Sequence, residues 1–222
     1  MSKDPVSTTK DVRAAVDAEL GFDPLVDAAD ITVRNIAGDV TLTGTVPSYP
    51  QYQEAAAAAQ RVAGVKHVHN HLSVELPAGD YRDDVQLATA ANNALTWDVT
   101  VPSGIEAAAR DGNLTLAGTV SFGSQRTAAE LAVSGLIGVR NVKNEIMIDF
   151  GADPGDVTVL VQDALDRNAL MLDDSDVLVD TAGNTVTLTG RVRTWAEHDA
   201  VIDATWMASG VYDVVDDLVI TG

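Results

Sequence analysis

One short segment occurs three times in this chain, and this repetition limits the possible folds more than any other feature. The segment alternates apolar and mostly threonine residues around a glycine, at Gly44, Gly118 and Gly190. A second segment, Gly-Val-x-x-Val, begins at Gly64, Gly138 and Gly210. In both segments the second copy lies 74 residues after the first, and the third lies 72 residues after the second. Because two separate landmarks keep the same offsets, the chain is predicted to contain three copies of one unit.

The boundaries between the copies are predicted from turn-forming composition. The sequences Pro77-Ala78-Gly79-Asp80 and Gly151-Ala152-Asp153-Pro154-Gly155 are typical of linkers. We expect a polar N-terminal tail over residues 1–10 and units over residues 11–76, 83–150 and 156–222. A unit of about 70 residues is small but long enough to fold alone.

Hydrophobic periodicity predicts the order helix, strand, strand, helix, strand in each unit. In the first unit Val12, Val16 and Leu20 form a helical stripe, which is expected to give way to a loop at Gly21. Residues 40–46 then alternate apolar and polar, as in a strand with one buried face. The expected fold class is α+β, with three tandem α-β-β-α-β domains. Each is a three-stranded mixed sheet covered on one face by two helices, and its third strand runs parallel to its second.

Local signals mark the ends of the second helix. Ser48 with Gln51, and Thr194 with Glu197, fit capping boxes, in which each side chain satisfies the other residue's main-chain N–H. Gly64 is expected to cap the C-terminus of this helix in the first unit. The glycine of the repeated strand lies in the apolar row, which favours close approach of a helix, or a bulge, over ligand contact. All six repeated glycines are therefore interpreted as structural.

Composition and charge exclude several classes of protein. The chain has 222 residues, with 33 Asp and Glu against 14 Lys and Arg, and a formal net charge of −19. Phosphate contacts need clustered Lys and Arg, so no nucleic-acid partner is expected. The chain has no Cys, which excludes disulfides and thiolate chemistry.

The apolar segments are too short for an integral membrane protein. No apolar run reaches the roughly 18 residues needed to span a bilayer, so no integral membrane segment is predicted. The polar residues 1–10 do not resemble a secretory signal, and we therefore expect a cytoplasmic protein.

The repeated motifs resemble those of the BON domain, a family named for bacterial osmotic-shock and nodulation proteins. The resemblance rests on a V-x-L-x-G-x-V strand, a helix and then G-V-x-x-V-x-N, whose last position is held by Asn70, Asn144 and Asp216. It covers nearly the whole chain outside residues 1–10 and the linkers. The resemblance implies a non-enzymatic binding module, often in stress-induced envelope proteins and proposed to contact phospholipid or other envelope components. One relative senses potassium, and the family offers no catalytic residues.

Two polar clusters suggest cation binding. His67, His69 and His71 alternate along the last strand of the first unit, and a His-x-His pair on a strand can share a metal ion. Asp173, Asp174 and Asp176 cluster in the third unit and could attract Ca²⁺. A solvated sheet face and a solvated loop are the favoured interpretations of these two clusters. No metal ligand, cofactor-binding residue or catalytic residue is therefore assigned.

Aromatic residues recur where the second helices begin. Tyr49, Phe122 and Trp195 are the candidate ligand-binding residues, because amphipathic rings can contact lipid or a protein at these places. The alternative is that they are hydrophobic staples that anchor the chain as it enters the helix.

The function predicted from the sequence is that of a non-catalytic binding or scaffold protein associated with osmotic stress. Its partner would be a protein or a lipid or other envelope component. Peripheral phospholipid binding and potassium or calcium sensing are the alternatives, the latter through the acidic third unit, which has 13 acidic and 3 basic residues. The motifs required for an enzyme are absent. Neither the ligand nor the oligomeric state is predicted from the sequence.

Overall fold

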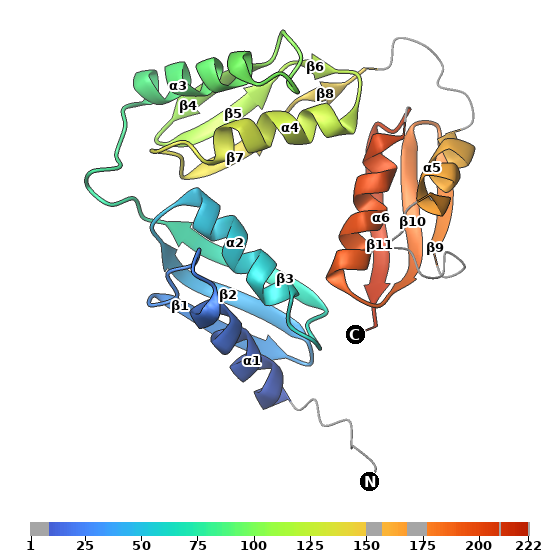
Figure 1. The fold of residues 1–222 in the computed structure, drawn as a ribbon, viewed down its shortest axis with the longest axis horizontal. Helices are drawn as coiled ribbons and strands as arrows, with labels where there is room; N and C mark the ends of the chain where they lie inside the picture. Colours follow the sequence, from blue (N-terminus) through green and yellow to red (C-terminus); the bar gives the residue numbers. More distant parts are fainter. Residues whose placement is uncertain (1–8, 150–156, 168–176, 209, 222) are drawn as a thin grey trace. The chain divides into compact units, whose positions relative to one another are not determined.

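A computed structural model describes residues 9–149, 157–167, 177–208 and 210–221, which form three repeats of one fold (Figure 1). The first repeat contains α1 (Thr9–Phe22), β1 (Ile31–Ile36), β2 (Asp39–Val46), α2 (Tyr49–Gln60) and β3 (His67–Val74). The second contains α3 (Asp84–Trp97), β4 (Glu106–Arg110), β5 (Asn113–Ala117), β6 (Thr119–Val120), α4 (Gly123–Ser134), β7 (Asn141–Asn144) and β8 (Met147–Ile148). The third contains α5 (Val157–Asp166), β9 (Val177–Ala182), β10 (Thr185–Val192), α6 (Trp195–Met207) and β11 (Asp213–Ile220).

The central strand of each sheet is the one that carries the repeated glycine. In the first repeat the order is β1-β2-β3, with β2 antiparallel to β1 and parallel to β3. The third repeat has the same arrangement around β10. In the second repeat the central strand is interrupted at Gly118, so that β5 and β6 pair separately with β7 and β8. The mixed three-stranded sheets and the parallel third strand confirm the predicted fold class.

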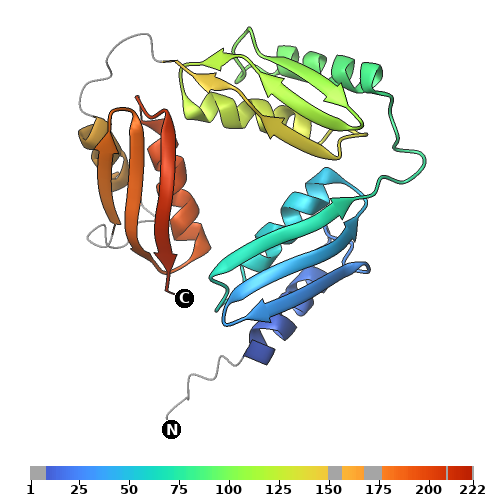
Figure 2. The same ribbon diagram turned by 180° about the vertical axis from the view of Figure 1, so that it is seen from behind.

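Two helices cover one face of each sheet, and the opposite face is uncovered (Figure 2). The predicted stripe of α1, Val12, Val16 and Leu20, is buried against Val40 and Leu42 of β2. The third repeat buries the matching apolar set between α5, α6 and its sheet. Burying such side chains contributes about 1.5–3 kcal/mol each, which drives the pairing of helix and sheet faces.

Two predicted helix limits differ from the structure. Helix α1 begins at Thr9, inside the segment expected to be a tail, and runs through Gly21 to Phe22. Helix α2 ends at Gln60 with Arg61 as its C-cap, so Gly64 lies in the following turn and does not cap the helix. In this turn Val65 donates its main-chain N–H to the carbonyl oxygen of Val62, and the Val65 side chain is buried.

The repeated strand glycine is required by a main-chain contact. Gly44 has a φ of 121°, and a Cβ atom there would lie 1.9 Å from the carbonyl oxygen of Asp30, just before β1. Thr45 donates its N–H to the same oxygen at 3.3 Å. Gly118 has a φ of 143° and approaches the carbonyl oxygen of Gly104 in the same way. The prediction of a close approach was correct, but the approaching group is a loop and not a helix.

The two expected capping boxes have different outcomes. Glu197 donates its N–H to the Thr194 hydroxyl at 3.2 Å, and its carboxylate accepts the N–H of Arg193 at 2.7 Å. Ser48 makes no side-chain cap hydrogen bond. The Gln51 side chain accepts the main-chain N–H of Asp27 at 2.7 Å instead. A tertiary contact to the loop before β1 therefore replaces the local cap in the first repeat.

Candidate binding surface

The aromatic residues predicted to bind a ligand differ in exposure. Tyr49 is 5% exposed and its ring stacks on Tyr52 at 5.7 Å. Trp195 is partly buried against the core of the third repeat and meets His198 edge-on at 4.9 Å. Phe122 is 40% exposed and is the N-cap residue of α4. Ligand binding by these three residues stays a prediction, and only Phe122 offers a large exposed surface.

The most exposed aromatic side chains lie where the first helix of a repeat ends. Phe22 is the last residue of α1 and Trp97 is the last residue of α3, and each is 84% exposed. Each follows the last buried leucine of its helix, Leu20 or Leu95, by two residues. The two rings therefore hold the same position in two repeats. Patches of exposed apolar side chains are typical of interaction surfaces, and each ring is followed within three residues by a second exposed apolar side chain, Leu25 or Val99.

The loop that follows each ring has the same hydrogen bonds in both repeats. Asp23 accepts the main-chain N–H of Leu25 at 2.9 Å, and Asp98 accepts that of Thr100 at 2.8 Å. The Thr100 hydroxyl also donates to Asp98, at 2.6 Å. These contacts form Asx turns, which hold a short loop in one conformation. We call residues 22–25 and 97–100 the apolar tips, since they also expose Leu25 and Val99.

Carboxylates stabilise both tips in their ionised form. The Leu25 N–H and the Arg61 guanidinium hold the pKa of Asp23 below its ordinary value. The hydroxyl and the N–H of Thr100 lower the pKa of Asp98 in the same way. A carboxylate accepts such hydrogen bonds better when it is charged, so both turns are favoured at neutral pH.

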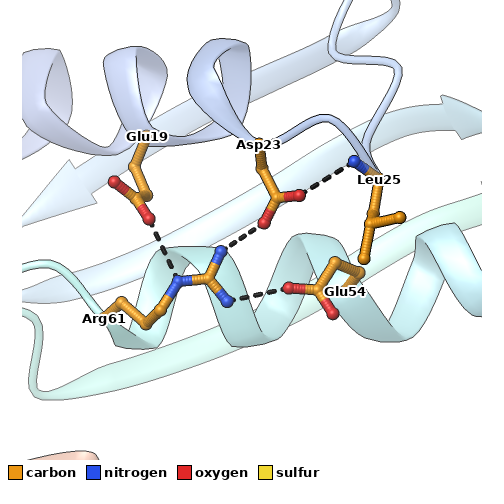
Figure 3. A network of polar contacts seen from close by, with 5 residues as sticks. All are labelled: Glu19, Asp23, Leu25, Glu54 and Arg61. Atoms are coloured by element: carbon orange, nitrogen blue, oxygen red, sulfur yellow. Dashed lines mark hydrogen bonds and ion pairs between the residues drawn. The ribbon is translucent and has the colours of Figure 1, made fainter.

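Arg61 ties the first tip to the second helix (Figure 3). Its guanidinium donates to Glu19 at 3.0 Å, to Glu54 at 2.8 Å and also to Asp23. Glu54, Glu19 and Asp23 together raise the pKa of Arg61, which is charged throughout the physiological range. One cation therefore joins the end of α1, the tip and α2.

A pocket of about 350 Å³ lies beside the second tip. It is lined by Leu95, Thr96, Asp98, Val99 and residues 101–105. Pockets of roughly 300–1,000 Å³ are the size that accepts small ligands or a side chain of a partner. The lining is mixed: apolar side chains stand beside hydroxyl groups, the Asp98 carboxylate and main-chain groups.

The second repeat also has a broad groove of about 670 Å³ between α3 and the edge strand β4. The Asn92 side chain accepts the main-chain N–H of Ala107 at 3.0 Å and donates to the carbonyl oxygen of Ala107 at 2.7 Å. Asp84 accepts the N–H groups of Asp111 and Gly112 in the hairpin turn. These side chains occupy the edge of the strand at two places, so only a short length of β4 is open to a partner strand.

Comparison with known proteins places these features in a family. The BON domain model matches the chain at residues 8–75, 83–149 and 153–222. The chain belongs to the BON domain family. The predicted resemblance is confirmed, and the tips, pocket and groove are features of individual BON domains. The predicted units, 11–76, 83–150 and 156–222, lie close to the matched ranges.

A curated relative of this BON protein is the osmotically-inducible protein Y of Escherichia coli K12. The two are 32% identical over 140 residues, which cover 61% of this chain and 70% of the relative. Two solved structures of CdsD, a structural protein of the type III secretion system of Chlamydia trachomatis, are 16% identical. They cover 99% and 94% of this chain, and 100% and 91% of their own. Their TM-scores of 0.26 and 0.25 are too low to support a comparison.

Of the two predicted cation clusters, the structure describes the histidine row of the first BON repeat. His67, His69 and His71 are exposed and lie on the uncovered face of the first sheet, as expected. Across the described residues no group of three His, Asp or Glu side chains converges as a metal site. Asp173, Asp174 and Asp176 lie outside the described residues. The described part of the chain also contains no helix long and apolar enough to cross a membrane.

Sequence reasoning missed the apolar tips, although a signal for them existed. A helix turns 100° per residue, so a residue two places after a buried leucine lies on the opposite side of the helix. Phe22 and Trp97 both have this spacing, and neither can join the apolar stripe. An aromatic residue at such a position, repeated in two units, predicts an exposed ring.

Proposed function

We propose that this BON-domain chain is a non-catalytic binding protein and that the apolar tips form part of its contact surface. The observation that carries the proposal is the equal exposure, 84%, of Phe22 and Trp97 at the same position in two repeats. Asx turns that use Asp23 and Asp98 hold both tips in one conformation, which reduces the entropy lost when a partner binds. Two such sites on one chain can act together if a partner reaches both.

A protein partner is the better candidate, for reasons of charge. The chain carries a net charge of −19, and the tips contain Asp23 and Asp98 but no Lys or Arg. An anionic lipid surface would repel such a chain, whereas a protein with an apolar patch bordered by basic residues would attract it. Peripheral binding to a phospholipid surface is the second candidate, because exposed aromatic and aliphatic side chains also insert into interfaces.

The proposed setting is osmotic stress. The relative named for osmotic induction supports this part of the proposal, through 32% identity over 140 residues. We also propose a cytoplasmic location for the chain. Quantifying the chain by immunoblot in fractionated cells, before and after an osmotic upshift, tests both statements.

The test of the binding role compares three full-length proteins on an affinity support. They are the parent, a Phe22→Ser, Trp97→Ser double variant, and Leu131→Ser, whose substitution removes a 66% exposed leucine of α4 outside the tips. Extracts of osmotically stressed cells are passed over each, and retained proteins are identified and then purified for direct titration. We expect a partner that binds the parent and Leu131→Ser equally and loses at least tenfold in affinity for the double variant.

Vesicles of phosphatidylcholine, with and without phosphatidylglycerol, distinguish the second candidate. Vesicle binding that is lost in the double variant, with a blue shift of tryptophan emission from Trp97, would replace the protein partner by a lipid surface. Equal retention of every ligand by the parent and the double variant would refute the role of the tips.

A further inference from the structure

We propose that the uncovered face of the first sheet binds a borderline transition-metal dication, such as Zn²⁺ or Cu²⁺, through neighbouring histidine pairs on β3. The structure puts all three imidazoles on one accessible surface. His67, His69 and His71 are exposed, while the alternate residues Val68 and Leu72 pack toward the core. Since β3 is an edge strand, side chains border the histidine row on one side only.

The spacing of these histidines suits a two-point chelate. Residues i and i+2 of a strand lie about 6.6 Å apart on the same face, at roughly 3.3 Å of rise per residue. Two imidazoles at this distance can turn toward each other and place one nitrogen each at about 2.0–2.1 Å from a shared ion. His69 belongs to both possible pairs, with His67 and with His71. Water molecules would complete the coordination.

The proposed chelate uses two imidazoles, because no three candidate ligands among the described residues converge. Exposed side chains change rotamer on the picosecond-to-nanosecond timescale, so closing a pair of imidazoles needs no movement of the backbone. The β2 partners of His69 and His71 are Thr41 and Thr43, whose side chains are small. They leave room above the sheet for the ion and its water.

Neighbouring charges affect the three positions differently. Asp39 is the register partner of His67, so a carboxylate stands beside one end of the row. Arg34 lies two strands away, in line with Thr41 and His69, and Lys66 precedes the row. These two cations weaken binding, but water screens exposed charges, and the −19 chain as a whole attracts cations. Direct ligation by the imidazole nitrogens therefore outweighs the repulsion from Arg34 and Lys66.

The other repeats lack the row and so act as internal comparisons. The matching positions hold Asn141, Lys143 and Glu145 in the second repeat and Asp213, Val215 and Asp217 in the third. Lys143 and Glu145 form an ion pair there. Imidazole nitrogen favours Zn²⁺ and Cu²⁺, whereas carboxylates favour Mg²⁺ and Ca²⁺. The chain has no Cys to compete for the softer ions.

The experiment titrates CuSO₄ into the ¹⁵N-labelled full chain at pH 7.5 and follows amide broadening by NMR, with ZnSO₄ calorimetry in parallel. Bound Cu²⁺ should broaden the amides of residues 67–71 and of Thr41 and Thr43 first. His69→Gln removes both pairs and should weaken binding by more than about tenfold, because each chelate becomes a single imidazole. His67→Gln is the matched control, since it keeps the His69 and His71 pair and should cost about twofold.

Each outcome decides the proposal. Broadening at β3 that His69→Gln removes and His67→Gln retains, with no response to MgCl₂, supports it. Broadening spread over acidic residues, or equal in the parent and in His69→Gln, overturns it. Thermal melts of both variants should match the parent, because both histidines are exposed on the sheet surface.

Discussion

The side-chain amide of Asn70 donates to the main-chain carbonyl oxygen of Tyr52 at 2.7 Å and so joins β3 to α2. Asn70 also accepts the N–H of Leu72, at 3.2 Å. In the second repeat Asn144 donates to the carbonyl oxygen of Arg126 at 3.0 Å and accepts the N–H of Ile146. The last position of the second repeated motif is thus a helix-to-strand connection, which explains why an amide occurs there.

Replacing Asn70 by Asp should destabilise the first repeat by about 1–3 kcal/mol, because a carboxylate cannot donate to the Tyr52 carbonyl and would face it across a partly buried contact. Urea unfolding followed by NMR of first-repeat amides measures the change.

The third repeat provides the control for this substitution. Asp216 already holds the matching position, and its carboxylate lies 2.8 Å from Nε2 of His198, the residue that matches Tyr52. Asp216→Asn should therefore not gain stability in the third repeat, although it creates the residue found in the other two. An increase there, or no loss from Asn70→Asp, would contradict the assigned role.

Gly44→Ala should unfold or strongly destabilise the first repeat, by more than about 3 kcal/mol, because the new Cβ meets the Asp30 carbonyl oxygen at a positive φ. Gly21→Ala is the matched control. Gly21 lies in α1, where an added Cβ atom would have no neighbour within 4 Å, and alanine in a helix should add about 0.5–1 kcal/mol. Thermal unfolding of both variants measures the difference, and similar melting temperatures would contradict the assignment.

The fold could be predicted because local and repeated signals agree. Only one set of buried faces is compatible with both the stripe of Val12, Val16 and Leu20 and the alternation in β2. An irregular pattern in one copy is also compensated by the regular patterns in the other two copies. Which strand is central could not be predicted, because that depends on the path of the connection after α2. The reason for Gly44 was also hidden, since Asp30 reaches it only through the loop before β1.

The candidate surface was harder to predict, because exposure depends on how elements end. Tyr49 and Phe22 are both aromatic residues at helix ends, but the first is buried and the second is exposed. Gln51 has the spacing of a capping residue, yet a hydrogen bond to Asp27 is made instead. Such tertiary contacts cannot be recognised from short-range sequence patterns. They decide between local conformations of similar free energy, such as a capped or an uncapped helix start.

Arg61→Met should lower the melting temperature of the first repeat by about 4 °C in low salt, because Glu19, Asp23 and Glu54 would then repel one another. The difference should shrink in 1 M NaCl, since screening weakens the repulsion among these three carboxylates. Arg13→Met, which breaks an exposed i,i+4 pair with Asp17, is the control and should change little. Equal effects of the two variants would show that the Arg61 network adds nothing beyond a single surface pair.

Stability should fall as the pH drops below about 4, through Asp84 and the two tip carboxylates. The N–H groups of Asp111 and Gly112 hold the pKa of Asp84 below its ordinary value of 3.8, and the pKa values of Asp23 and Asp98 are lowered too. A lowered folded-state pKa stabilises the fold above the unfolded value, and this contribution disappears as the pH falls through the folded value. The urea midpoint of unfolding, determined between pH 7 and pH 2.5, measures this loss of stability.

Asp84→Asn should reduce the stability of the second repeat at pH 7, and the stability that remains should fall less on acidification. Asp203→Asn, at an exposed carboxyl group of α6, is the control and should leave the second repeat unchanged. An unaltered pH dependence in Asp84→Asn would contradict this role.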